Sequence, residues 1–143
     1  MKEDKNGVIE RLLEAPYHII DFLSRRVPVD SEGQFFAVEK FFRAERGDEL
    51  RKRFADILLK LNCYYSFEVF ADYSDEGIKD PAPEELSALV EGNEFALNVL
   101  IASDDALITL DTDDTNMTVY NASDEMLDLL ESLASACGMF LWR

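Results

Sequence analysis

The spacing of apolar residues predicts helices in the first part of the chain. Val8, Ile9, Leu12 and Leu13 recur at helical intervals, and Pro16 ends this pattern. Residues 48–61 repeat the pattern more regularly and predict a second, longer helix. Counted from Leu50, its apolar positions lie at offsets of 0, 4, 7, 8 and 11 residues: Leu50, Phe54, Ile57, Leu58 and Leu61.

An aromatic-rich segment just before residue 48 predicts a further helix. Ser31 and Gln34 have the spacing of a capping box, which marks a helix start. Gly47 is expected to end this helix as a C-terminal cap, and Asp48 can cap the next one. Its apolar residues are Phe35, Phe36, Val38, Phe41 and Phe42.

The second part of the chain changes from helical spacing to alternation. Residues 63–73 are rich in aromatic and β-branched side chains and predict a strand. Residues 95–102, 106–110 and 116–120 predict three more strands, with a short helix at 83–92. Residues 17–27 can form either a strand or a short helix. The first strand would place these residues on one side: Tyr65, Phe67, Val69, Ala71 and Tyr73.

The last helix is predicted between Ser123, which can cap its start, and Gly138, which can end it. Residues 139–142 can add a final short strand. This order predicts an α+β fold, with N-terminal helices packed on one face of a mostly antiparallel sheet of about four to five strands, and a C-terminal helix. The length of 143 residues predicts a single globular domain over residues 1–143.

Charge is the property in which this chain departs most from an average protein. The formal net charge is −16, and its distribution is uneven. Residues 1–62 contain 12 basic and 12 acidic side chains, whereas residues 63–143 contain 2 basic and 18 acidic ones. Such an excess repels polyanions, so we expect neither nucleic acid nor an anionic membrane as a partner. The charged N-terminal residues lack an apolar stretch, and we expect a cytoplasmic location.

Cysteine, histidine and glycine usage predicts neither a cofactor nor a metal site. Cys63 and Cys137 belong to no C-x-x-C pair, and His18 is the single histidine. We therefore expect two buried free thiols. The six glycines form no phosphate-binding loop or dinucleotide fingerprint.

The acidic segment 111–116 raises the question of a calcium loop. Counted from Asp111, an EF-hand needs glycine at position 6 and glutamate at position 12, but Asn116 and Ala122 occupy these positions. Asp and Asn side chains favour turns, so we interpret the segment as a hairpin turn. A weak cation site remains the alternative.

Catalysis has little support in the sequence, and we expect a non-catalytic protein. His18 has Asp21 three residues on, which could orient its ring in a helix, but no nucleophile motif accompanies them. The alternative function is a small-molecule-binding protein or enzyme with a pocket between helices and sheet near His18. The aromatic residues that could line this pocket are Tyr64, Tyr65, Phe67, Phe70 and Trp142.

The charge distribution and the missing catalytic motifs favour a non-catalytic protein-interaction module that binds a basic protein partner. A dense acidic face accelerates encounter with such a partner, while apolar residues hold it. Arg43 to Arg53 form a local basic cluster that could meet the acidic part of a second copy, so a homodimer is possible. We predict an acidic binding face formed by two strand connections: Asp104, Asp105, Asp111, Asp113 and Asp114.

In size, acidity and order of elements, the chain is similar to the small immunity proteins that neutralise bacterial toxins. The resemblance covers composition and layout, and no diagnostic residues carry it. It implies an immunity-like or adaptor role, with a basic protein as the partner.

Overall fold

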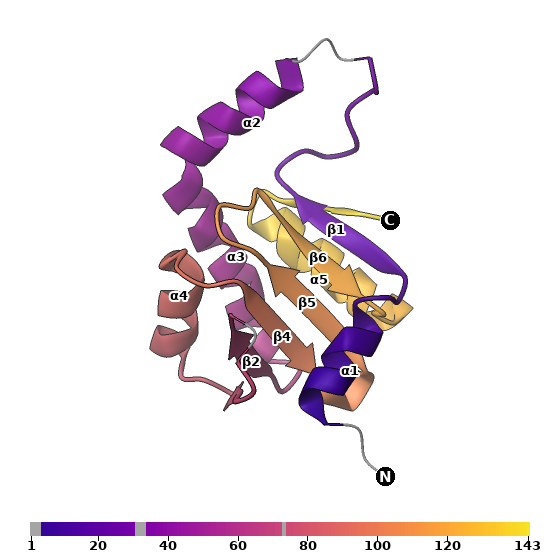
Figure 1. Cartoon of the computed structure of the whole chain (residues 1–143). Coiled ribbons are helices and arrows are strands. Elements are labelled where there is room, and N and C mark those ends of the chain that lie inside the picture. The colour runs from indigo at the N-terminus through magenta and orange to yellow at the C-terminus, as the bar shows by residue number, and fades with distance from the viewer. Residues whose placement is uncertain (1–3, 31–33, 73) are drawn as a thin grey trace.

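The computed structural model describes residues 4–30, 34–72 and 74–143. Within these residues the chain forms α-helices and strands that together make one mixed α+β architecture (Figure 1). The helices are α1 (Lys5–Leu12), α2 (Gln34–Glu45), α3 (Gly47–Asn62), α4 (Pro83–Glu91) and α5 (Asp124–Ala136). The strands are β1 (Tyr17–Asp21), β2 (Glu68–Ala71), β3 (Ile78–Lys79), β4 (Leu97–Ile101), β5 (Ala106–Leu110), β6 (Asn116–Tyr120) and β7 (Phe140–Trp142).

The described strands form one seven-stranded sheet in the order β3-β2-β4-β5-β6-β1-β7. Every neighbouring pair is antiparallel, which confirms the predicted fold class. The predicted number of four to five strands was too low. Residues 17–21 and 140–142, which the sequence left open, both form strands. The two-residue β3 also lies in a segment that the sequence presents as a loop, because a strand this short carries no alternation.

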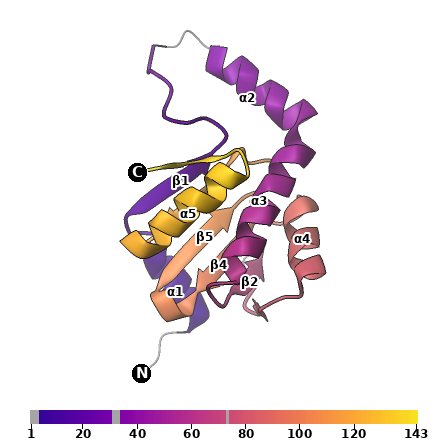
Figure 2. The ribbon, with the colours of Figure 1, turned by 180° about the vertical axis from the view of Figure 1, so that it is seen from behind.

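Helices cover both faces of the sheet, which corrects the prediction of one covered face. Helices α3, α4 and α5 pack on one face, and α1 crosses the other (Figures 1 and 2). The reason lies in the central strands, which have apolar side chains on both sides. Leu100 and Leu107 point away from α3 and α5, and Ile9 and Leu12 of α1 cover them.

The larger core lies between the sheet and helices α3, α4 and α5. Phe54 and Leu58 of α3, Leu86 of α4 and Leu130 of α5 are fully buried there. They pack against alternate residues of the central strands, such as Val99. Burial of an aromatic or aliphatic side chain stabilises the fold by roughly 1.5–3 kcal/mol each, so this layer holds the helices in place.

Helix α2 lies at one end of the molecule, beyond the layer formed by the other helices (Figures 1 and 2). None of its described side chains is fully buried. Phe42 stacks on Phe22 with ring centroids 4.8 Å apart, and this contact holds α2 to the body. The predicted capping residue Ser31 lies outside the described residues.

Gly47 does not end α2 as predicted, because it is the first residue of α3. The Arg46 amide donates to the carbonyl of Phe42 (2.8 Å), and the Leu50 amide donates to the carbonyl of Arg46 (3.0 Å). Helical bonding therefore runs almost continuously through residue 46, and a glycine that keeps a negative φ does not stop a helix.

The last helix begins and ends where the sequence predicts. Ser123 accepts a hydrogen bond from the Met126 amide (3.1 Å), and Gly138 adopts a φ of +75°. The Met139 amide donates to the carbonyl of Ala134 (2.8 Å), which is the bond of a Schellman motif. Among the residues that the structure describes, no helix is both long and apolar enough to cross a bilayer.

Two phenylalanines of neighbouring helices provide a matched test of this packing. Phe54 is fully buried, whereas Phe36 is 70% exposed. We expect Phe54→Ala to lower the free energy of unfolding by about 3–5 kcal/mol through the lost contacts and the cavity left behind. Phe36→Ala should change it by no more than about 0.5 kcal/mol. Urea denaturation of both variants measures the difference, and equal losses would contradict this account of the core.

Candidate functional site

A groove of about 500 Å3 lies between α1 and the part of the sheet that α1 leaves uncovered. Pockets for small ligands commonly have volumes of roughly 300–1,000 Å3. The side chains that line the groove come from α1, β2, β4, β5 and the turns beside them: Asn6, Ile9, Glu10, Leu13, Phe70, Ser74, Ala96, Leu97, Asn98, Thr109, Leu110, Asp111 and Asp114.

The floor of the groove follows from the register of the two central strands. Asn98 of β4 lies directly opposite Thr109 of β5, so the two side chains share one face of the sheet. They interrupt the apolar run on the face that α1 covers further along. Phe70 of β2 adds an aromatic side to this floor. The groove is therefore amphipathic, with apolar walls and a polar strip along its base.

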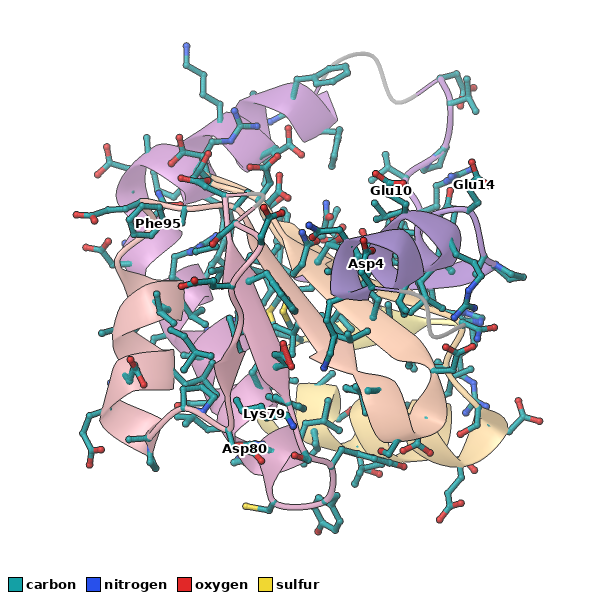
Figure 3. The ribbon with its side chains drawn as sticks, turned by 60° about the horizontal axis from the view of Figure 1, so that its bottom comes forward. Asp4, Glu10, Glu14, Lys79, Asp80 and Phe95 are labelled. Carbon is teal, nitrogen blue, oxygen red and sulfur yellow. The ribbon has the colours of Figure 1, made fainter. Side chains whose placement is uncertain are left out.

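All the charged side chains that line the groove in the described part of the chain are acidic. Glu10 projects from α1, and Asp111 and Asp114 come from the turn between β5 and β6. Figure 3 shows Glu10 of α1 and Glu14, which follows the end of this helix, on the same side of the molecule. Because no described Lys, Arg or His lines the groove, the described lining is negatively charged and favours a cationic ligand.

The acidic segment after β5 is a hairpin turn that its own side chains stabilise. The Asp111 amide donates to Asp114 Oδ2 (3.0 Å), and Asp111 Oδ1 accepts from the Thr112 amide (2.7 Å). Asp113 adopts a φ of +60° and exchanges two 2.7 Å bonds with Asn93. Such Asx bonding is typical of turns. In the described part of the chain, no group of three or more His, Cys, Asp or Glu side chains is arranged to hold a metal ion.

Asp114 is a partly buried acid of the groove whose carboxyl group has a shifted pKa. Burial raises the pKa of its carboxyl group, and the neighbouring Asp111 raises it further. The Asp111 amide, Arg51 and Arg43 lower this pKa and so oppose the effect. A poorly hydrated carboxylate of this kind gains more from a bound cation than an exposed one does, because the effective dielectric constant around it is lower.

Arg51 positions the turn from the opposite side. Its side chain is buried, with Nε donating to the Val90 carbonyl (2.8 Å) and Nη1 to the Asp111 carbonyl (2.9 Å). These bonds link α3 to the end of α4 and to the hairpin. Burial lowers the pKa of the guanidinium, while the three aspartates of the turn raise it. Nη2 has no hydrogen-bond partner within the described chain.

A second, smaller cavity of about 120 Å3 lies between the turn and the start of α3. Arg43, Arg51, Asn93 and Asp113 line it, and Asp114 lines both cavities. The turn thus separates an acidic groove from a hollow that contains two arginines.

The structure does not bring the five predicted acidic residues together. Asp104 and Asp105 precede β5, and Asp111, Asp113 and Asp114 follow it, so the two groups lie at opposite ends of this strand. Successive turns of an antiparallel meander alternate between the ends of a sheet, which is the physical reason for the separation. The prediction of one continuous face through all five residues was therefore wrong.

The two groups also differ in their surroundings. Asp105 forms a bidentate ion pair with Arg11, at 2.8 and 3.0 Å, and this bonding lowers the pKa of its carboxyl group. Asp104 accepts a bond from the Ser103 hydroxyl (2.8 Å). Of the five, only Asp111 and Asp114 line the larger groove, whereas Asp113 lines the smaller cavity.

His18 is in a structural environment and lines neither of these two cavities. Its Nδ1 lies 3.0 Å from the carbonyl oxygen of Trp142. A carbonyl only accepts, so Nδ1 carries a proton. Trp142 Nε1 in turn donates to the Leu23 carbonyl (2.8 Å). Of the aromatic residues predicted to line a pocket, Phe67 and Phe70 are both buried in the core, and Phe70 also borders the groove.

Sequence reasoning missed Glu10, Asn98 and Thr109. Glu10 lies on the polar side of an ordinary amphipathic helix, and nothing in the sequence shows which sheet face that helix covers. Asn98 and Thr109 did leave a signal, because each is a polar residue within an otherwise apolar central strand. Their pairing depends on the register of β4 and β5, which only the structure provides.

Comparisons with known proteins leave these residues as the basis for any functional argument. No family model, curated protein sequence or solved structure matches the chain.

The role of Arg51 in holding the turn can be tested by substitution. Arg51→Met keeps most of the aliphatic stem but removes both carbonyl contacts. We expect a loss of about 2–5 kcal/mol in the free energy of unfolding, because two buried acceptors and the adjacent aspartates lose their donor. Arg53→Met, on the exposed side of α3, is the control and should change stability by no more than about 1 kcal/mol. Chemical denaturation of both variants decides the comparison.

A second buried acid, Asp21, predicts a pH dependence away from the groove. Asp21 accepts from the Leu23 amide (3.1 Å), and burial raises the pKa of its carboxyl group, with Glu39 contributing. A raised pKa in the folded state means that this carboxyl stabilises the fold below its unfolded pKa of about 4. That contribution is lost as pH rises through the raised value.

We therefore expect Asp21→Asn, which retains an acceptor for the Leu23 amide, to be more stable than the native chain at pH 7. The difference should shrink toward pH 4, where the aspartate is itself protonated. Thermal denaturation at a series of pH values measures this. A native chain that is the more stable of the two at pH 7 would contradict the proposed effect of burial.

Proposed function

We propose that this protein is a non-catalytic interaction module that binds a basic protein partner through the acidic groove beside α1. The observation that carries the proposal is the charge of the described groove lining, whose ionisable side chains are carboxylates: Glu10, Asp111 and Asp114. The apolar walls would hold the aliphatic part of a lysine or arginine side chain, while these carboxylates bind its charged end.

The composition of the chain supports the same partner chemistry. A net charge of −16 attracts basic proteins over a distance and accelerates their encounter with the groove. Binding energy would then come from contacts within the groove, where Leu13 is 43% exposed. Buried apolar contacts of this kind usually contribute most of the affinity, whereas exposed charges set the association rate.

An immunity-like or adaptor role is consistent with this mechanism. Both roles require a rigid surface that recognises one partner and carries out no reaction. The groove has that property, since its floor is a paired sheet and the turn at its end is held by Arg51. A cytoplasmic location remains our expectation.

A second candidate function is the binding of a small organic cation in the same groove. The groove volume of about 500 Å3 is that of a ligand pocket, and this favours the alternative. An enzyme that uses His18 has no such support, because its imidazole is hydrogen-bonded to the Trp142 carbonyl and lines neither cavity.

The test compares two variants that remove the same number of charges. The groove variant carries Glu10→Gln, Asp111→Asn and Asp114→Asn, and its amides keep the acceptors of the turn. The control variant carries Glu84→Gln, Glu85→Gln and Glu91→Gln on the exposed side of α4. The probe is an octalysine peptide, and its affinity is measured by titration calorimetry. We expect the groove variant to bind at least about tenfold more weakly, a change of roughly 1.4 kcal/mol.

The control variant should retain most of the affinity, and association with the native chain should slow as salt rises, because exposed charges are screened beyond about 8 Å at physiological ionic strength. Equal losses in the two variants would mean that binding follows net charge alone and would refute the groove. If spermidine binds as tightly as octalysine and competes with it, the small-cation alternative replaces the protein partner.

A further inference from the structure

Helix α2 carries a surface stripe whose chemistry is the complement of the groove. Phe36, Lys40 and Arg43 follow one another at intervals of four and three residues, which places them on one side of the helix. All three are exposed, and Phe36 is exposed to 70%. The stripe therefore presents one aromatic ring followed by two cations.

The apolar residues of α2 extend around much of its circumference, which is unusual for an exposed helix. Phe42 packs on Phe22 toward the body, yet Phe41 on another side is 49% exposed. Helices that are apolar on several sides are normally buried, and large exposed apolar surfaces often mark interaction sites. The position of α2 at one end of the molecule leaves this surface accessible (Figures 1 and 2).

We propose that α2 of one copy docks into the acidic groove of a second copy. This inference rests on the proposed function, because it uses the groove as a receptor for a basic, partly apolar segment. Phe36 would lie against Leu13, which lines the groove and is 43% exposed. Lys40 and Arg43 would face Glu10, Asp111 and Asp114. Charge complementarity of this kind specifies which surfaces meet.

Two-fold symmetry makes the contact reciprocal. Each copy has one α2 and one groove, so a closed dimer contains the same contact twice. The dimer would cover the groove in which a basic partner is proposed to bind. Self-association and partner binding therefore compete for the same carboxylates.

The net charge of −16 per copy predicts how this association responds to salt. Two such molecules repel one another at long range, and salt screens that repulsion. Burial of Phe36 does not depend on screening in the same way. We therefore expect dimerisation to strengthen from low to moderate ionic strength, whereas association with octalysine slows over the same range.

Two full-length variants separate the two halves of the contact. The α2 variant carries Phe36→Ala, Lys40→Gln and Arg43→Gln and keeps its groove. The groove variant carries Glu10→Gln, Asp111→Asn and Asp114→Asn and keeps its α2. Sedimentation velocity at about 0.15 M salt should show a concentration-dependent dimer for the native chain and monomers for either variant alone. An equimolar mixture should form a dimer again, weaker than the native one because it has one contact instead of two.

The outcomes distinguish this inference from the proposed function. A native chain that stays monomeric at all concentrations, or a groove variant that still dimerises, would overturn the docking of α2 in the groove. Octalysine should dissociate the native dimer and should bind the α2 variant at least as tightly as it binds the native chain. If octalysine binds the α2 variant and the native chain equally and neither dimerises, the proposed function stands and this inference fails. If the groove variant binds octalysine normally, the proposed function itself fails.

Discussion

The structure depends on one packing constraint, which is that the central strands are apolar on both faces and need cover on both. Helices α3, α4 and α5 satisfy this need on one side, with Phe54 and Leu58 in the buried layer. On the other side, α1 is only eight residues long and covers Phe70, Leu100 and Leu107. The groove is the remainder of that face. It exists because a short helix covers a wide sheet, and Asn98 and Thr109 make the uncovered strip compatible with water.

The negative charge of the groove arises from the same geometry. The β5–β6 turn lies at the end of the uncovered strip, and its aspartates stabilise the turn through bonds to nearby amides. Bonding within the turn thus explains why these acids are present. Because the turn lies at the end of the groove, the same acids also give the groove its negative charge. Arg51 beneath the turn compensates part of their charge without reaching the groove, so the carboxylates remain the charged groups that a ligand meets.

The sequence predicted the type of most elements because helical and alternating patterns are strong in long segments. The helices around Phe54 and Leu130 and the strands of the central meander followed from these patterns. Three features could not be predicted. Edge strands such as β3 are too short to alternate, the face that α1 covers depends on tertiary packing, and Gly47 begins α3 instead of capping the end of α2. Of the predicted acidic residues, Asp111 and Asp114 line the groove, while Asp104 and Asp105 lie at the other end of β5.

The uneven distribution of charge along the chain affects which ion pairs the folded protein forms. Several basic residues of the first part pair within the same chain: Arg11 with Asp105 of the second part, Arg43 with Glu39 and Arg53 with Glu49. Arg51 donates hydrogen bonds to the carbonyl groups of Val90 and Asp111. The acids of the second part have few such partners, since Lys79 and Arg143 are the only bases in residues 63–143 and Arg143 pairs with α5. Among the described residues no base lines the groove, so in the proposed binding mode its cation would come from a second molecule.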